Sequence, residues 1–202
     1  MEFNSLNFSL ILIITTLILL LMIYHRFYPE RFTRIAIGRN IKLYLYPQHY
    51  HLIENIDLNC TNGEKLQIKQ LVVSRYGLFI IETYHHRGII YGSNHQVKWL
   101  STGSMHSRVF VNPSMSHQPS CDILANYLQL PPAVINLISV FTGNSRLLVP
   151  APTNSCNPDS LIRAISEHRD VRINPKLLPT IIAILQNTQK QQQLVMKYNT
   201  KN

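Results

Sequence analysis

The stretch LQIKQLVVSRYGLFIIETY, residues 66–84, decides the fold of this chain. Both of its halves are rich in β-branched and other apolar residues, which favour β-strands. Between them stands Arg75-Tyr76-Gly77, and its glycine suits a tight turn. We therefore expect two strands, residues 66–74 and 78–85, joined by that turn.

The rest of the chain predicts a β-rich core followed by helices. Turn residues separate further apolar segments that predict strands over residues 52–58, 88–91, 96–100, 132–142 and 146–149. Helices are expected over residues 113–130 and after the Asn-Pro pairs at 157–158 and 174–175, because asparagine caps a helix and proline opens one. Residues 31–46 predict a poor helix interrupted by Gly38, and the polar tail from Gln186 is expected to fray. This order indicates an α/β (α+β) fold, with a mixed β-sheet flanked by helices.

Length and composition allow one domain and an appendage. The chain has 202 residues, of which 46% are hydrophobic, too few for two large cores. Lys and Arg exceed Asp and Glu by nine, so the surface field suits nucleic-acid phosphates or anionic lipid headgroups. Cys60, Cys121 and Cys156 are widely spaced and form no Cys-x-x-Cys pair. We expect reduced thiols in a cytoplasmic domain rather than a disulfide framework or a zinc site.

The appendage is an uncharged apolar run from Phe8 to Tyr24, about 17 residues, near the lower limit for a transmembrane helix. A cleavable signal peptide is the alternative, but it would want a basic start and small residues at its end, whereas Glu2 is acidic and His25-Arg26 follows the run. A buried core helix is a second alternative, which the apolar character of every face disfavours. We expect a membrane anchor.

Charge around this run predicts its orientation. No Lys or Arg precedes it, and four arginines follow it: Arg26, Arg31, Arg34 and Arg39. By the positive-inside rule, the N-terminus is expected outside and the rest of the chain in the cytoplasm. The sequence thus predicts a single-pass protein of the inner (cytoplasmic) membrane. If the basic segment also touches anionic lipid, Arg26, Arg31 and Arg34 are the residues expected to do so.

Residues 67–99 resemble the nuclease-related domain (NERD) family. Members of that family carry a Gln-Ile-Asp-His strand, a turn with glycine, a strand ending in Ile-Glu-x-Lys, then a Gly-x-Ile-x-Gly strand and a Trp. This chain has, in the same order, Gln67-Ile68-Lys69-Gln70, Gly77, Ile81-Glu82-Thr83-Tyr84, Gly88-Ile89-Ile90-Tyr91-Gly92 and Trp99. Asn112-Pro113 and Gln118 resemble the family's Asn-Pro-x-x-Gln entry to a helix, with a longer spacing.

The resemblance implies a restriction-endonuclease-like fold and a domain organisation. We expect a membrane anchor over residues 1–28 and a basic juxtamembrane segment over 29–50. The nuclease-related domain would then occupy residues 51–150, and C-terminal helices with a polar tail residues 151–202. Family members often carry a transmembrane helix, which agrees with the front of the chain.

The resemblance also implies a catalytic site, and this chain departs from it at two of three positions. In such nucleases an Asp on one strand and a Glu on the next hold Mg²⁺, which polarises the scissile phosphate and activates water. A Lys two residues beyond the Glu shares its strand face and stabilises charge on the phosphate. Here Glu82 remains, Lys69 stands at the Asp position and Tyr84 at the Lys position. One carboxylate beside an ammonium group is a poor magnesium site.

Two interpretations of these three residues stay open. In the first, Lys69 and Glu82 form a cross-strand salt bridge, Tyr84 packs on or caps the sheet, and no cofactor is bound. In the second, the site has migrated: Lys69 replaces the missing lysine, Asp57 or Glu54 supplies a second carboxylate, and Glu82 holds Mg²⁺.

The sequence therefore supports three functional hypotheses. The first is a membrane-tethered pseudoenzyme that binds DNA, RNA or a protein partner through a basic face, with Arg75, Arg87 and Lys98 as the residues expected to contact nucleic acid. The second is an active metal-dependent nuclease with a rearranged site. The third is a membrane-anchored scaffold that does not bind nucleic acid.

Overall fold

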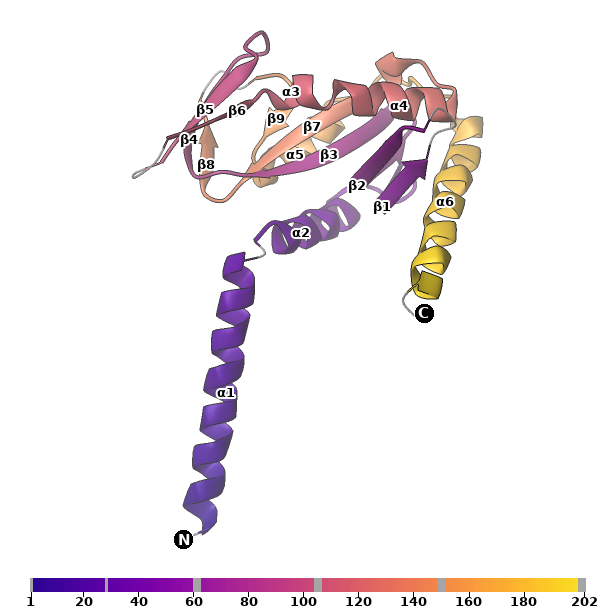
Figure 1. The fold of residues 1–202 in the computed structure, drawn as a ribbon. Coiled ribbons are helices and arrows are strands. Elements are labelled where there is room, and N and C mark those ends of the chain that lie inside the picture. The colour runs from indigo at the N-terminus through magenta and orange to yellow at the C-terminus, as the bar shows by residue number, and fades with distance from the viewer. Residues whose placement is uncertain (1, 28, 60–62, 104–106, 149–151, 200–202) are drawn as a thin grey trace.

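The structure is a computed structural model of the 202-residue chain. It describes the backbone of residues 2–27, 29–59, 63–103, 107–148 and 152–199, and the side chains of residues 9–22, 33–59, 63–103, 107–148 and 152–191. A long N-terminal helix leads into a body of two β-sheets with helices on both faces of the larger one (Figure 1). The fold is mixed α/β, as the sequence predicts.

The larger sheet has five strands in the order β1-β2-β3-β7-β9. The strands β1, β2 and β3 pair antiparallel, whereas β3, β7 and β9 run parallel. Arg75 and Tyr76 connect β2 and β3, so the predicted pair of strands with its tight turn is confirmed. The bounds of these strands are Tyr50–Asn59 (β1), Lys65–Ser74 (β2), Gly77–His85 (β3), Ile135–Thr142 (β7) and Ser155–Cys156 (β9).

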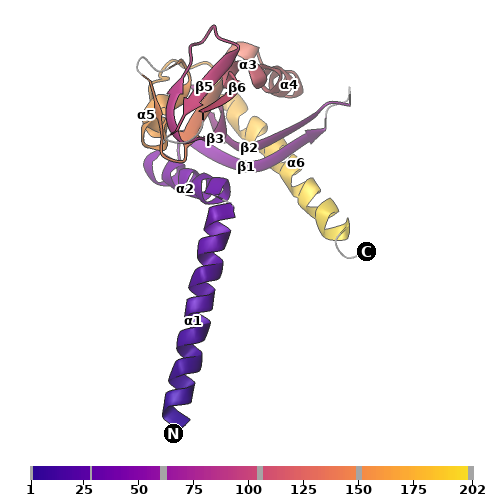
Figure 2. The same cartoon turned by 60° about the vertical axis from the view of Figure 1, so that its left-hand side comes forward.

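Each face of this sheet is covered by a separate hydrophobic core. On one face, α4 (Gln118–Leu128) and α6 (Leu178–Asn199) pack against alternate residues of the strands, such as Leu71, Ile80 and Leu137. On the other face, α2 (Pro29–Tyr44) and α5 (Leu161–Ser166) cover the residues between them, such as Phe79 and Ile81. Figure 2 shows α2 and α6 along the β1–β2 hairpin. The sheet is therefore a middle layer, as expected for strands with few polar residues.

The smaller sheet has the order β6-β5-β4-β8 and closes over the end of β3 and β7. Its inner face holds a third core of Ile90, Trp99, Phe141 and Leu147. Its strands are Gly88–Tyr91 (β4), Lys98–Thr102 (β5), Ser107–Val111 (β6) and Ser145–Leu147 (β8). Short helical elements complete the chain: α3 (Pro113–Ser116) and three 3₁₀ turns, η1 (Pro132–Val134), η2 (Pro158–Ser160) and η3 (Pro175–Leu177).

Several local predictions need correction. The helix predicted over residues 113–130 is two helices that meet at His117, and β6 was not predicted. Asn174 caps its helix by accepting from the backbone N–H of Lys176 at 3.0 Å. Asn157 does not cap; its amide donates to the carbonyl of Ser145 at 2.8 Å, which ties the helix start to β8. The tail expected to fray continues as α6 to Asn199.

Gly38 does not interrupt α2, because tertiary packing favours a glycine there. A Cβ at this position would lie 2.8 Å from Oε1 of Glu54 and 2.9 Å from Nε2 of Gln70. The absent side chain lets the helix approach β1 and β2 closely, and this contact outweighs the low helix propensity of glycine. The segment expected to be a basic juxtamembrane connection is thus packed on the sheet through Ile37, Ile41 and Leu45.

The N-terminal helix α1 (Glu2–Phe27) covers the whole run predicted as a membrane anchor. Its side chains are described for residues 9–22 alone, and all of them are exposed. Within the described residues, no helix meets the length and apolarity needed to cross a membrane. The two thiols that can be assessed, Cys121 and Cys156, are free and buried, and Cys60 lies outside the described residues.

Candidate functional site

The three residues at the family's catalytic positions lie where β2 and β3 separate. The last pair between these strands is Gln70 with Ile81, and Lys69 and Glu82 are the next residue on each strand beyond it. Glu82 lies level with Ser139 on β7, and Tyr84 with Phe141. Because residues level across a sheet share a face, Glu82, Tyr84 and Ser139 lie on the face that carries Leu71 and Ile80. Glu82 and Tyr84 therefore share one face of the sheet, and Lys69 follows the same pair on the neighbouring strand.

The carboxyl group of Glu82 is held in a partly buried position that disfavours its charge. Burial raises its pKa from 4.5 to about 7, and the positive charges of Lys69 and Arg34 only partly offset that effect. Desolvation is therefore the larger influence. With its pKa raised toward neutral, the carboxyl group is protonated more readily than an ordinary glutamate, so it is a weaker ligand for a cation.

Lys69 does not form the expected cross-strand salt bridge with Glu82. Among the described side chains, the ion pairs are Lys42 with Glu54 and Arg163 with Glu167. The ammonium group of Lys69 donates instead to the side-chain carbonyl of Gln67, two residues away on the same strand. The interpretation as a salt bridge is therefore wrong, because the strands diverge at this point. Lys69 acts on Glu82 through its charge without a direct contact.

Tyr84 packs within the site and stays neutral. Its ring stacks on Phe141 with a centroid distance of 5.5 Å and meets the ring of His117 edge-on at 6.0 Å. Burial raises the pKa of its hydroxyl, the charge of Glu82 raises it further, and Ser116 lowers it slightly. A neutral phenol cannot stabilise a phosphate charge as an ammonium group does. Packing, which the sequence predicts for Tyr84, is confirmed.

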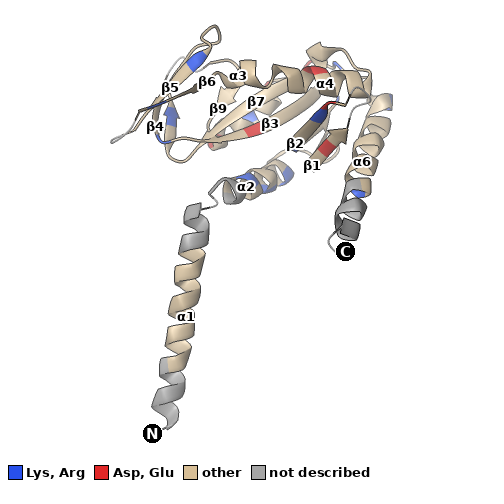
Figure 3. Ribbon diagram, viewed as in Figure 1, with Lys and Arg blue, Asp and Glu red and all other residues tan. Residues whose placement is uncertain are grey.

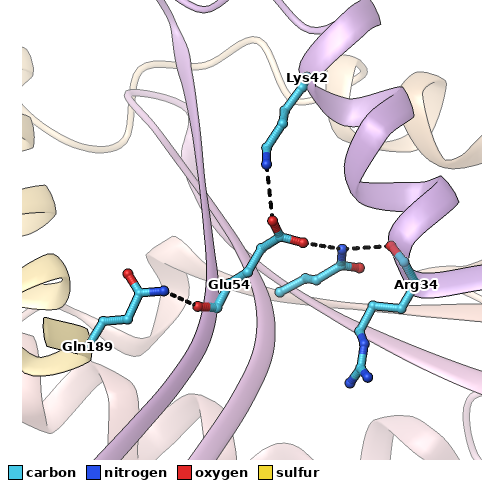
Figure 4. A network of polar contacts seen from close by, with 5 residues as sticks. Arg34, Lys42, Glu54 and Gln189 are labelled. Atoms are coloured by element: carbon cyan, nitrogen blue, oxygen red, sulfur yellow. Dashed lines mark hydrogen bonds and ion pairs between the residues drawn. The ribbon is translucent and has the colours of Figure 1, made fainter. Parts of the chain in front are cut away.

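Glu54, a candidate second carboxylate, is committed elsewhere. It accepts from Nζ of Lys42 at 3.1 Å and from Nε2 of Gln70 at 3.1 Å. Figure 4 shows that these partners converge on it from α2 and β2, while Gln189 of α6 donates to its backbone carbonyl. The other candidate, Asp57, is level with Gln67 on β2. In the described part of the chain, no three His, Cys, Asp or Glu side chains gather as metal ligands.

These observations decide whether the magnesium ion implied by the resemblance fits the site. Magnesium prefers several carboxylate and water oxygens. The site offers one carboxyl group with a pKa of about 7, next to two cationic side chains. The residues present do not fit the metal, and metal-dependent hydrolysis has no support in this geometry.

Arg34 is a site residue that sequence reasoning assigned to another role. Its backbone carbonyl accepts from Nε2 of the fully buried Gln70 at 3.0 Å, which fixes this turn of α2 beside β2 (Figure 4). Its charge reaches Glu82 from there. The signal for this placement is the pattern Ile37, Gly38, Ile41, which defines the inner face of α2 and puts residue 34 on it.

The three residues expected to contact nucleic acid do not share one surface. Arg75 lies in the turn before β3, where its side chain donates to the hydroxyl of Tyr76 at 2.8 Å. Arg87 follows the other end of β3, about 30 Å away for a strand of this length. Lys98 opens β5 in the smaller sheet. Figure 3 likewise shows basic residues scattered over β4–β6 and gathered on α2.

The fold and the site can be compared with those of known protein families. The family model described as "Nuclease-related domain" matches residues 33–142, more than half of the chain. The chain belongs to the nuclease-related domain family. The match begins within α2, at residue 33, and ends with β7, so both strands of the candidate site lie inside it.

One curated relative is an uncharacterized protein of Bacillus anthracis, 30% identical over 69 residues. That similarity covers 34% of this chain and 32% of the relative, so the chain spans about a third of the length of that protein. No solved structure matches the chain.

Proposed function

We propose that this nuclease-related protein does not hydrolyse nucleic acid and instead binds its phosphates at the site around Glu82. One observation carries the proposal: the positive charges of Lys69, on the neighbouring strand, and of Arg34, on α2, both act on a carboxyl group whose pKa is about 7. Two cationic side chains that act on one carboxyl group with a raised pKa give the site a net positive charge at neutral pH. An active site of this family would use the opposite arrangement, with carboxylates that attract a metal ion.

Cationic side chains take over the attraction that a bridging metal would exert. Lysine and arginine bind phosphate directly, and arginine does so with two parallel hydrogen bonds. Both side chains are partly exposed, so a phosphate can reach them. We infer contact with the phosphate backbone rather than the bases, because the sequence contains no recognition-helix motif. We also propose that the domain has the restriction-endonuclease-like fold that the resemblance implies.

The direct test measures binding and cleavage of DNA and RNA with and without Mg²⁺ or Mn²⁺. We expect binding that needs no metal and is weakened by Lys69→Gln, with no cleavage above background. Metal-dependent cleavage that disappears in Glu82→Ala would instead establish an active nuclease with a rearranged site. Absence of binding to either nucleic acid would favour a scaffold or a protein partner.

We further propose that α1 anchors the protein in the cytoplasmic membrane, with its N-terminus outside and the nuclease-related domain in the cytoplasm. The support is the surface of α1: its described large hydrophobic side chains, from Leu10 to Met22, are 47–65% exposed and have no protein to cover them within the described residues. A reporter fused after Asn202 tests the orientation. Activity of a cytoplasmic reporter supports the proposal, whereas activity of a periplasmic reporter reverses it.

A further inference from the structure

Helix α2 and the residues just after it carry the most exposed large hydrophobic side chains described outside α1. Outside α1, the four most exposed large hydrophobic side chains all lie in or just after this helix: Ile35 (66%), Leu43 (67%), Tyr44 (69%) and Tyr46 (76%). Soluble surfaces carry such residues singly, and a cluster of them marks an interaction surface. The cluster therefore needs a partner.

The geometry of the helix shows that this face is distinct from the one that packs on the sheet. Ile37, Gly38, Ile41 and Leu45 form the buried side. At 3.6 residues per turn, Ile35, Arg39, Lys42 and Leu43 fall within an arc of about 100° on the opposite side. Arg39 is exposed, and Lys42 is 62% exposed although it also pairs with Glu54. The outer face is thus amphipathic, with apolar and basic residues side by side.

We propose that this outer face, defined by Ile35, Arg39, Lys42 and Leu43, lies on the surface of an anionic lipid bilayer together with Tyr46, which follows the end of the helix. Aliphatic and aromatic side chains would enter the boundary between headgroups and acyl chains, while Arg39 and Lys42 contact lipid phosphates. Tyrosine is enriched at this depth because its ring is apolar and its hydroxyl polar.

The position of α2 favours a bilayer over a protein partner. The helix starts at Pro29, two residues after α1 ends at Phe27. Figures 1 and 2 both show α1 leading away from the body and α2 lying across its end, between α1 and the sheet. A bilayer crossed by α1 would therefore meet the side of α2 that faces away from the sheet, which is the apolar and basic one.

The lipid contact on α2 is thereby assigned to Arg39 and not to Arg34. The sequence predicts that Arg34 contacts lipid, but its charge acts on Glu82 at the inner side of α2. Arg39 replaces it as the lipid contact. The domain would be held close to the membrane by two elements, α1 and the outer face of α2, and the Glu82 site on the larger sheet would be left free to bind its ligand.

The test places a fluorescent reporter on this face in the full-length protein. Leu43→Trp is compared with Val109→Trp, whose position on β6 is similarly exposed (60%) and lies on the distant sheet. The native Trp99 is buried and adds the same background to both variants. The protein is reconstituted into phosphatidylcholine vesicles with or without phosphatidylglycerol, and brominated phosphatidylcholine serves as the quencher. Flotation of the vesicles reports membrane attachment separately.

We expect the emission of Leu43→Trp to shift to the blue and to be quenched by brominated lipid, with no such change for Val109→Trp. Adding Arg39→Gln should shift the equilibrium between lipid-bound and free α2 about fivefold toward the free form on the anionic vesicles, the effect of one basic residue at such a surface.

Protein that floats with the vesicles while Leu43→Trp stays unquenched would overturn the contact and leave the α1 anchor intact. Protein that does not float would overturn both. A blue shift in the absence of vesicles would show that protein, such as a second copy of the chain, covers the face. Nucleic-acid binding at the Glu82 site is a separate measurement and does not depend on any of these outcomes.

Discussion

Glu82 and Lys69 follow the last pair between β3 and β2, yet the lysine only partly offsets the burial that raises the pKa of Glu82 to about 7. The pair therefore behaves as a weak acid near a cation rather than as a salt bridge. Position in the strands makes the difference, because the two strands separate here and Lys69 bonds to Gln67. The stability of the protein and its affinity for phosphate should both respond to the protonation of Glu82.

The first prediction concerns the pH dependence of stability. In the folded protein the pKa of Glu82 is about 7, above its ordinary value of 4.5, so the folded state binds a proton that the unfolded state has lost between these pH values. The free energy of unfolding should fall as pH rises from about 4.5 to 7. The shift corresponds to about 3 kcal/mol as an upper limit, since each pKa unit is worth about 1.4 kcal/mol. Glu82→Gln removes this contribution.

Urea denaturation followed by the fluorescence of Trp99 measures the effect. We compare the free energy of unfolding of Glu82→Gln with that of the native protein at two pH values. The variant minus the native protein should be more positive at pH 8 than at pH 5. A difference between the two proteins that does not change with pH would show that Glu82 titrates normally.

The second prediction concerns Ser139, which is level with Glu82 on β7. The residue is 1% exposed, and its hydroxyl oxygen has no hydrogen-bond partner among the residues that the structure describes. An unpaired buried hydroxyl costs about 1–3 kcal/mol, so its removal costs little. We expect Ser139→Ala to leave the free energy of unfolding unchanged or to raise it by about 1 kcal/mol. Thr142→Val is the matched control, because the Thr142 hydroxyl donates to the carbonyl of Tyr84 at 3.3 Å and its loss should destabilise.

The third prediction concerns the glycine motif that the chain shares with its family. A Cβ at Gly92 would lie 2.3 Å from ring atoms of Trp99, whose indole is buried and cannot move aside. Gly92→Ala should destabilise the protein by about 3 kcal/mol, the upper end of the usual cost of overpacking. Circular dichroism during thermal unfolding measures it. Combined with Trp99→Leu, the substitution should cost less than the sum of the two single changes, whereas strict additivity would contradict the contact.

The hairpin of β2 and β3 shows what the sequence can predict. The strands of residues 66–85 follow from apolar runs around a turn, and the proximity of Lys69, Glu82 and Tyr84 follows from their order on two neighbouring strands. The sequence could not predict that β2 and β3 diverge at Lys69 and Glu82. Because of this divergence, the two side chains form no salt bridge. Divergence depends on packing from segments far apart in the chain.

The strand β1 illustrates the same limit. Ile53 and Ile56 belong to one core although a strand of period two would point them to opposite faces. Asn55 between them has a φ of 55°, in the left-handed region, and this reverses the alternation. Side chains of β1 therefore do not alternate between the two sheet faces along its whole length, as a regular strand would predict. Likewise, Arg34 acts on Glu82 because α2 packs on the sheet; the pattern Ile37, Gly38, Ile41 marks the inner face of the helix but does not show which strands it covers.

The last prediction concerns phosphate binding at the Glu82 site. Protonation of Glu82 removes a negative charge that interacts with Lys69 and Arg34, so affinity for duplex DNA or RNA should be higher at pH 6 than at pH 8. Glu82→Gln should bind at pH 8 as tightly as the native protein does at pH 6 and should lose most of the pH dependence. His117, whose ring meets Tyr84, has a pKa lowered by burial, so comparison with Glu82→Gln separates the carboxyl group from the histidines.

Salt dependence identifies which basic residues touch phosphates. The log–log slope of affinity against salt is about −0.9 for each phosphate neutralised on duplex DNA. Lys69→Gln should make the slope less steep by about one such unit and weaken binding to all sequences alike. Arg75→Gln is the control at the far end of β3, and Arg87 and Lys98 can be removed together to test the smaller sheet. A slope that changes with Arg87 and Lys98 but not with Lys69 would move the phosphate contact to the smaller sheet and contradict a role for the Glu82 site.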